Sequence, residues 1–262
     1  MPDDGLGEVQ FLEKLVASGR APTLAGIVAA CDLSHPDVDE HLKQLVVAST
    51  KLRGIRFMLD YEGPYDGKNA THISCSRHNT DYLRDTSGAA EKFEHGYGLL
   101  AKYQLSFDLQ CCPAQLDAAA ALAARHPNVP LVIDHLGKLR RLSLDGSALD
   151  AAKLEEWRHG LRKMAALPHV YVKISMLGYI VPNWHQDAKK EAYVKDLVRE
   201  VIALFGTKRC MFDSNWHQNG AAADSGPSMQ ELFDKYQSLV ADFDEESQHD
   251  LFSGTAAAFY RV

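Results

Sequence analysis

The sequence predicts an α/β fold built on a parallel sheet, and three observations support this prediction. Six short apolar runs occur along the chain, and each one ends in polar residues. Amphipathic stretches long enough for helices separate these runs, as they do in successive βαβ units. No glycine-rich phosphate loop follows any run, which argues against a dinucleotide-binding sheet. Right-handed crossovers then leave either a barrel or an open doubly wound sheet.

The expected strands are the apolar runs, because parallel strands that are covered on both faces lack polar alternation. The most informative run is LVIDHLGK, in which an acid and an imidazole follow the apolar residues and a glycine then turns the chain. In chain order, the six runs cover 24–32, 53–60, 105–110, 131–138, 170–175 and 209–217.

Helices are expected between these strands, where apolar residues recur at helical spacing. In one such stretch Val38, Leu42 and Leu45 share a face. Pro113 suits the first turn of another helix, because its ring fixes φ near the helical value. The predicted helices cover 37–49, 89–103, 113–125, 149–167 and 187–205.

The composition fits one globular domain over residues 1–262. With 46% hydrophobic residues, the chain can bury a sizeable core. A net charge of −7 argues against a nucleic-acid or membrane partner but says nothing about a small anionic substrate, which responds to local charge. The expected partner is a small-molecule substrate. No apolar run approaches the roughly 20 residues that span a bilayer. The acidic N-terminus lacks an apolar signal core, so we expect a cytoplasmic protein.

A polar insertion at about 60–88 interrupts the alternation of strands and helices. It is rich in Gly, Asp, Asn, Ser and Thr. Loops of this length are usually functional lids or solvated insertions. We expect a solvated insertion. The alternative is a lid that closes over a substrate with His72, Arg77, His78 and Arg84.

Polar residues at the strand ends are the candidates for chemistry, because the active sites of parallel barrels lie where the strands end. His135 is a candidate metal ligand or proton carrier, or it only caps its strand by hydrogen bonding. Arg56 can bind a substrate carboxylate through two parallel hydrogen bonds. Its alternative role is a structural salt bridge to Asp60 or Asp32.

Further candidates follow from strand periodicity. Asp108 and Gln110 alternate along one strand, so their side chains share a face. Lys173 lies in the middle of a strand and either reaches a cavity or pairs with an acid. A Cys111 nucleophile served by His135 is a further alternative, although buried structural cysteines are more common.

Five motifs carry a resemblance to a known family: RGIR at 53–56, FDLQ at 107–110, VIDHLGK at 132–138, VKIS at 172–175 and LFGTKRCMFDSNW at 204–216. In their order and spacing, the chain resembles the amidohydrolase-related branch of the amidohydrolase superfamily. This branch includes fuconolactonase and 2-pyrone-4,6-dicarboxylate lactonase. The resemblance begins near residue 8 and includes the closing segment LFSGTAAAFYRV at 251–262. It implies a TIM-barrel-like (β/α)₈ fold.

The sequence departs from the family pattern at the first strand, because it has no His-x-His pair. The six predicted βα units correspond to the third through eighth strands of the family, so we expect an incomplete barrel. The segment 8–18 is then the helix after the absent second strand. The explanations are a longer natural protein, a truncated paralogue, or a gap filled by another chain or an unrelated helix. Exposed sheet edges also favour a homo-oligomer.

A second departure lies at the eighth family strand, where Asn215 replaces a catalytic aspartate. A carboxamide cannot accept a proton from water as a carboxylate does. Asp213 shares a face with Asn215, roughly 6–7 Å deeper along the strand, and could act as the base. It could instead be a buried acid paired with Lys173. His217, which replaces a proline, adds another proton acceptor.

The predicted function is hydrolysis of a small carboxylated cyclic ester, a lactone, by activated water. The alternative is a non-catalytic or truncated paralogue that binds a small acid or a partner chain. No metal ligand is assigned, and Zn or Mn is expected only if a longer form supplies the His-x-His pair. The predicted catalytic residues are His135, Asp213 and Asn215, and the predicted substrate-binding residues are Arg56, Asp108, Gln110, Lys173 and His217.

Overall fold

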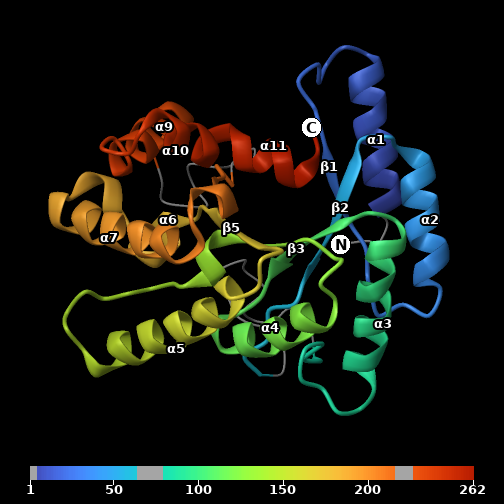
Figure 1. Cartoon of the computed structure of the whole chain (residues 1–262), viewed down its shortest axis with the longest axis horizontal. Helices are drawn as coiled ribbons and strands as arrows, with labels where there is room; N and C mark the ends of the chain where they lie inside the picture. Colours follow the sequence, from blue (N-terminus) through green and yellow to red (C-terminus); the bar gives the residue numbers. More distant parts are fainter. Residues whose placement is uncertain (1–4, 64–78, 216–226) are drawn as a thin grey trace.

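The computed structural model describes residues 5–63, 79–215 and 227–262. Six parallel strands form one sheet, in which each strand pairs with the next along the chain (Figure 1). This arrangement confirms the predicted α/β fold. The strands are β1 (Ile27–Ala30), β2 (Leu52–Met58), β3 (Ser106–Gln110), β4 (Leu131–Ile133), β5 (Val170–Ile174) and β6 (Cys210–Phe212).

Each predicted helix is present within a few residues of its expected bounds. One difference is that Pro113 begins a short 3-10 turn, Pro113–Gln115, and the α-helix starts immediately after it. The helices around the strands are α1 (Gly5–Ala17), α2 (Val38–Ala48), α3 (Ala89–Lys102), α4 (Leu116–Arg125), α5 (Ala148–Ala165) and α7 (Ala188–Phe205). The remaining helices are α6 (Leu177–Ile180), α9 (Met229–Leu239), α10 (Glu245–His249) and α11 (Thr255–Tyr260).

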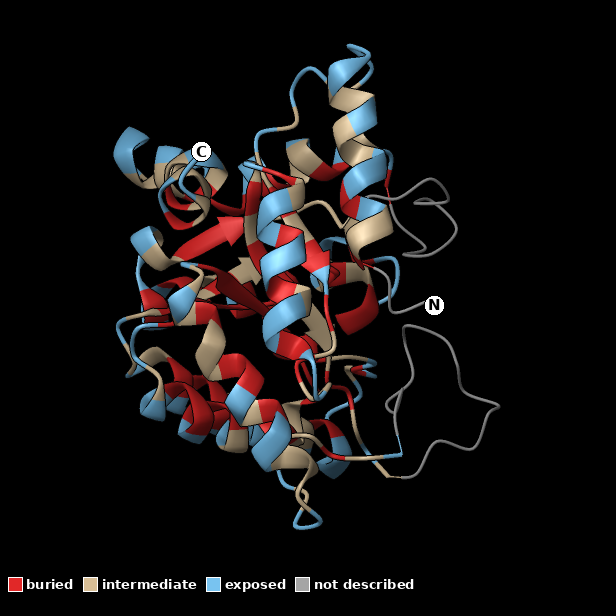
Figure 2. Cartoon of the chain, turned by 90° about the vertical axis from the view of Figure 1, so that its right-hand side faces the viewer, coloured by how far each residue is buried: buried red, intermediate tan, exposed pale blue. Residues whose placement is uncertain are grey.

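The main core lies between one face of the sheet and the surrounding helices. Figure 2 shows buried residues on the strands and on the inward sides of the helices, whose outer sides are exposed. Strand β3 is buried at every position, including its polar residues Ser106, Asp108 and Gln110. Trp157 of α5 and Phe93 of α3 are fully buried in this core. Burial of such large side chains contributes about 1.5–3 kcal/mol each to stability.

The second face of the sheet carries the polar residues. Arg56 lies opposite Asp108, and Asp108 lies opposite Val132, so these three side chains share this face. A small apolar cluster on the same face joins Val132 and Met211 to Phe259 of α11. The C-terminal helix therefore covers part of the face that bears the candidate site.

Within the described ranges, no strand pairing joins β1 to β6. The sheet order thus agrees with the predicted incomplete barrel. In the same ranges, no helix is both long and apolar enough to span a membrane. Residues His72, Arg77 and His78 of the predicted insertion lie outside the described residues. Arg84 is described, and its guanidinium forms an ion pair of 2.7 Å with Asp81.

Candidate active site

The end of β4 is an unusual left-handed turn that positions two side chains of the site. His135, Leu136, Gly137 and Lys138 have φ angles of +57°, +52°, +69° and +59°. Only glycine adopts this conformation without strain, and other residues lose about 1–2 kcal/mol each. Two hydrogen bonds hold the turn, from the Gly137 N–H to the Asp134 carbonyl (3.0 Å) and from Trp157 Nε1 to the Leu136 carbonyl (2.6 Å). Backbone strain of this kind is concentrated at functional sites.

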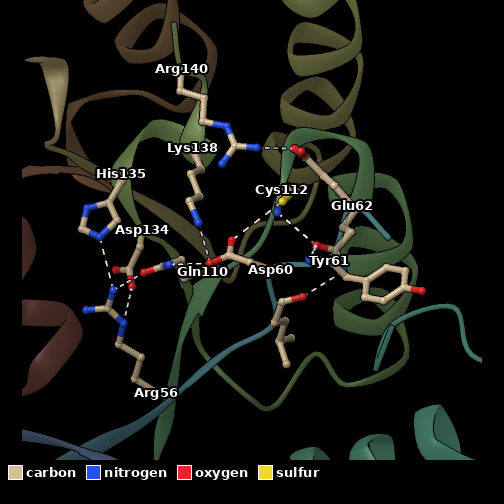
Figure 3. A network of polar contacts seen from close by, with 12 residues as sticks. Arg56, Asp60, Tyr61, Glu62, Gln110, Cys112, Asp134, His135, Lys138 and Arg140 are labelled. Atoms are coloured by element: carbon tan, nitrogen blue, oxygen red, sulfur yellow. Dashed lines mark hydrogen bonds and ion pairs between the residues drawn. The ribbon is translucent and has the colours of Figure 1, made fainter. Parts of the chain in front are cut away.

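The left-handed turn also explains why the predicted strand 131–138 ends at Ile133. Leu136 and Lys138 rarely adopt a positive φ, so the sequence gives no sign of the turn beyond Gly137. His135 and Lys138 both extend from it towards the polar residues of neighbouring strands (Figure 3).

His135 is buried and held through both ring nitrogens. Its Nδ1 lies 2.8 Å from Ser175 Oγ, and its Nε2 lies 3.2 Å from Arg56 Nη2. A guanidinium group has donors only, so Nε2 must accept and the ring proton must sit on Nδ1. Burial lowers the pKa of His135 to about 4, and the nearby Arg56 charge acts in the same direction. The imidazole is therefore neutral at pH 7.

Arg56 lies at the centre of the site. Its Nε forms an ion pair of 3.1 Å with Asp134 Oδ2, and its Nη2 donates to Gln110 Oε1. Arg56 does form a salt bridge, but its partner is Asp134, which follows β4 two strands away, and not the expected Asp60 or Asp32. The Arg56 side chain is 34% exposed. Its Nε and Nη2 are therefore held by Asp134 and Gln110, while part of the side chain is exposed to solvent.

Lys173 is paired with acids, which confirms one of its two predicted roles. Its Nζ lies 2.6 Å from Asp108 Oδ2 and 3.0 Å from Asp134 Oδ1. Burial alone would lower the pKa of Lys173, but the two carboxylates outweigh it and raise that pKa well above its usual value. Burial likewise raises the pKa of Asp134, yet Lys173 and Arg56 outweigh it and bring that pKa to about 2.

Asp108 receives a second hydrogen bond, donated by the Tyr260 hydroxyl at 2.7 Å. Burial raises the pKa of Asp108, against the effect of Lys173. The predicted substrate-binding residues Asp108 and Lys173 therefore form, together with Asp134, an internal charge cluster, which contacts Arg56 through Asp134.

Asp213 and Asn215 follow β6, where the predicted strand 209–217 ends early. The Asn215 N–H donates to Asp213 Oδ1 at 3.2 Å, and a positive φ of 46° at Asn215 turns the chain out of the sheet. Asp213 is half-buried, and its charge only partly opposes the burial that lowers the pKa of His135. Lys173 pairs with the two other acids rather than with Asp213. His217 lies outside the described residues.

Several residues of the site were not assigned from the sequence. Asp134, Ser175, Asp60 and Tyr260 contact predicted residues, and Lys138 forms an ion pair with Asp60. Asp134, Lys138 and Ser175 belong to the quoted motifs, so their position at strand ends was the available signal.

The Cys111 nucleophile alternative finds little support in this geometry. Cys111 is buried, and burial raises the pKa of its thiol. Both His135 ring nitrogens face other partners, Ser175 and Arg56.

The described residues do not fit a resident divalent metal. In those parts of the chain, no group of three or more His, Cys, Asp or Glu side chains could hold a metal ion. The His135 nitrogen that could bind a metal instead faces the Arg56 guanidinium at 3.2 Å. A cation at that position would be repelled by Arg56.

The chain is similar to known amidohydrolases and lactonases. Residues 15–262 match a family model whose description is amidohydrolase. An L-fucono-1,5-lactonase of Burkholderia multivorans is 28% identical over 265 residues, which are 98% of this chain and 78% of the lactonase.

Solved structures of amidohydrolases are also similar to this chain. One is the crystal structure of an amidohydrolase from B. multivorans with bound HEPES, whose sequence is 27% identical. The match covers 98% of this chain and 79% of that amidohydrolase, with a TM-score of 0.75. Another crystal form with bound zinc has a TM-score of 0.74. A probable 2-pyrone-4,6-dicarboxylic acid hydrolase from Acinetobacter baumannii is 11% identical, with 99% and 79% coverage and a TM-score of 0.67. This last likeness shows the shared fold alone.

Proposed function

Since this chain belongs to the amidohydrolase family, we propose that it hydrolyses a small lactone. One observation carries the proposal: the guanidinium of Arg56, whose side chain is part-exposed, lies 3.2 Å from the neutral imidazole of His135. The half-buried carboxylate of Asp213 acts on both groups through its charge. The name of the lactonase relative supports the same reaction class.

Arg56 would stabilise the oxyanion that forms on the lactone carbonyl. Among the described residues, Asp134, Gln110 and His135 occupy Nε and Nη2, which leaves Nη1 to face a ligand. Donors fixed before the reaction stabilise developing charge without reorganising, and removing one such donor typically lowers kcat about 100-fold or more. A substrate carboxylate would be attracted to the same cation.

Asp213 would act as the general base. In the proposed step a water oxygen attacks the carbonyl carbon, and the water proton passes to the Asp213 carboxylate. The ring C–O bond then breaks, and the leaving alkoxide takes that proton to give a hydroxy acid. Asn215 would orient the water, and His135 would hold Arg56 through Nε2 rather than polarise the carbonyl. No step of this mechanism passes through a metal.

A panel of lactones tests this proposal. We expect acid release from five- or six-membered sugar lactones, measured by pH-stat, with and without a ring carboxylate. Asp213→Asn and Arg56→Met should each lower kcat/KM at least about 100-fold. His159→Ala removes an exposed histidine of α5 and should leave the rate unchanged. Turnover of no lactone, or equal rates in all these variants, would contradict the assignment. Binding without turnover, measured by calorimetry, would favour the non-catalytic alternative instead.

A further inference from the structure

Asp60 forms a buried junction next to the candidate site. Its side chain is fully buried, and Lys138, whose side chain is 2% exposed, lies 2.5 Å from its Oδ2. The same oxygen accepts a hydrogen bond of 2.6 Å from Gln110 Nε2 (Figure 3). One carboxylate oxygen therefore receives both an ammonium and an amide.

This contact fixes the direction of the Gln110 amide. The Gln110 Nε2 points to Asp60, and its Oε1 accepts from Arg56 Nη2. The reversed amide would place its NH₂ group against the guanidinium and its oxygen against a carboxylate, which loses both hydrogen bonds. Asp60 therefore determines which end of Gln110 faces Arg56.

The orientation of the Gln110 amide also affects the contact between Arg56 and the His135 imidazole. The Nη2 that donates to Gln110 also lies 3.2 Å from His135 Nε2. Gln110 thus holds the guanidinium in the position at which its nitrogen meets the imidazole.

We propose that Asp60 is a positioning residue, which orients Gln110 so that the Gln110 oxygen holds Arg56 beside His135. Lys138 supplies the countercharge without which a carboxylate at this buried position is strongly destabilising. This role also explains the left-handed turn after β4, because the turn directs His135 and Lys138 from one short segment into the same network. The catalytic consequence rests on the proposed lactone hydrolysis, but the positioning itself does not.

Two double variants separate positioning from a merely structural ion pair. Asp60→Asn with Lys138→Met removes both charges but keeps an oxygen that accepts from Gln110. Asp60→Leu with Lys138→Met removes both charges and the acceptor. Replacing a buried ion pair by apolar groups is often neutral for stability, so both proteins should fold. Gln110→Met keeps the ion pair and removes the oriented amide, and it serves if the leucine variant does not fold.

Side-chain ¹⁵N NMR of the folded proteins gives the first measurement. The wild type should show a neutral His135 with its proton on Nδ1 and a restrained Arg56 guanidinium, assigned with Arg56→Met. The Asn/Met variant should keep these signals, whereas the Leu/Met variant and Gln110→Met should lose them. Lys208→Met, at an exposed ion pair with Glu246, should leave them unchanged. Identical Arg56 and His135 signals in the two double variants would overturn the proposal.

Lactone hydrolysis gives the second measurement. The Leu/Met variant should lose about 100-fold in kcat, because small misplacements of binding groups have effects of that size. The Asn/Met variant should stay close to the wild type. If the wild type hydrolyses no lactone, the proposed function fails, while the NMR comparison still decides whether Asp60 positions Arg56.

Discussion

At the scale of single residues, the chemistry of the site depends on an imidazole that stays neutral. Burial and the Arg56 charge disfavour the imidazolium, and the hydrogen bond from Arg56 Nη2 requires a free lone pair on Nε2. In Asp134 the balance is opposite, since two cations keep the buried carboxylate ionised. Adjacent residues of one motif thus take different ionisation states because different partners face them.

The neutral state of His135 predicts a stability that falls in mild acid. Its folded pKa of about 4 lies below the unfolded value of 6.5, so the unfolded chain binds more protons between these values. Stability is therefore complete above about pH 6.5 and is lost as the pH falls towards about 4. Between about pH 7 and about pH 5, His135 should lower the free energy of unfolding by about 2 kcal/mol.

Urea titrations at both pH values check this prediction. His135→Gln should remove about 2 kcal/mol of the wild-type difference between the two pH values, whereas His159→Gln, at an exposed histidine, should keep it. An unchanged pH dependence in His135→Gln would show that the imidazole titrates normally.

At the scale of elements, the turn after β4 contains most of the strain in the site. Gly137 has a φ of +69°, and an added Cβ would lie 3.2 Å from Leu116 Cδ1. Gly146 also has a positive φ, +73°, but an added Cβ there would meet nothing within 4 Å. Alanine substitutions at these two glycines therefore separate the free-energy cost of backbone strain from that of packing.

Gly146→Ala should cost about 1 kcal/mol from backbone strain alone, and Gly137→Ala should cost about 1–2 kcal/mol more because its neighbours must also move. Chemical denaturation measures both values. Equal costs would mean that the packing around the turn adapts freely.

The elements also show what sequence periodicity can and cannot predict. Strand alternation correctly placed Asp108 and Gln110 on one face of β3, and the strand register then brings Arg56 of β2 opposite Asp108. It could not show that the Gln110 amide donates to Asp60, since that contact depends on Lys138 and on a left-handed turn that only Gly137 signals in the sequence. Helix α9 was missed although a signal existed. Ser228 and Glu231 form a capping box, which marks a helix start.

At the scale of the whole molecule, the C-terminal helix connects distant parts of the sheet. Phe259 packs among residues of β4, β5 and β6, with its ring centroid 4.8 Å from that of Tyr171. Tyr260 donates to Asp108, and the Arg261 guanidinium donates to the Gln104 carbonyl at 2.7 Å. The last turn of the chain thus supports the internal charge cluster that contacts Arg56.

This placement predicts that α11 is part of the core rather than an appendage. Phe259 is 4% exposed, so Phe259→Ala should lower the free energy of unfolding by about 3–5 kcal/mol. Phe11 of α1 is 58% exposed, and Phe11→Ala should change stability by no more than about 0.5 kcal/mol. Tyr260→Phe keeps the ring and removes only the hydrogen bond to Asp108, so its cost should be about 1 kcal/mol. Thermal and urea unfolding measure all three. If Phe259→Ala were as mild as Phe11→Ala, the helix would not be packed on the sheet in solution, and its support of the charge cluster would be wrong.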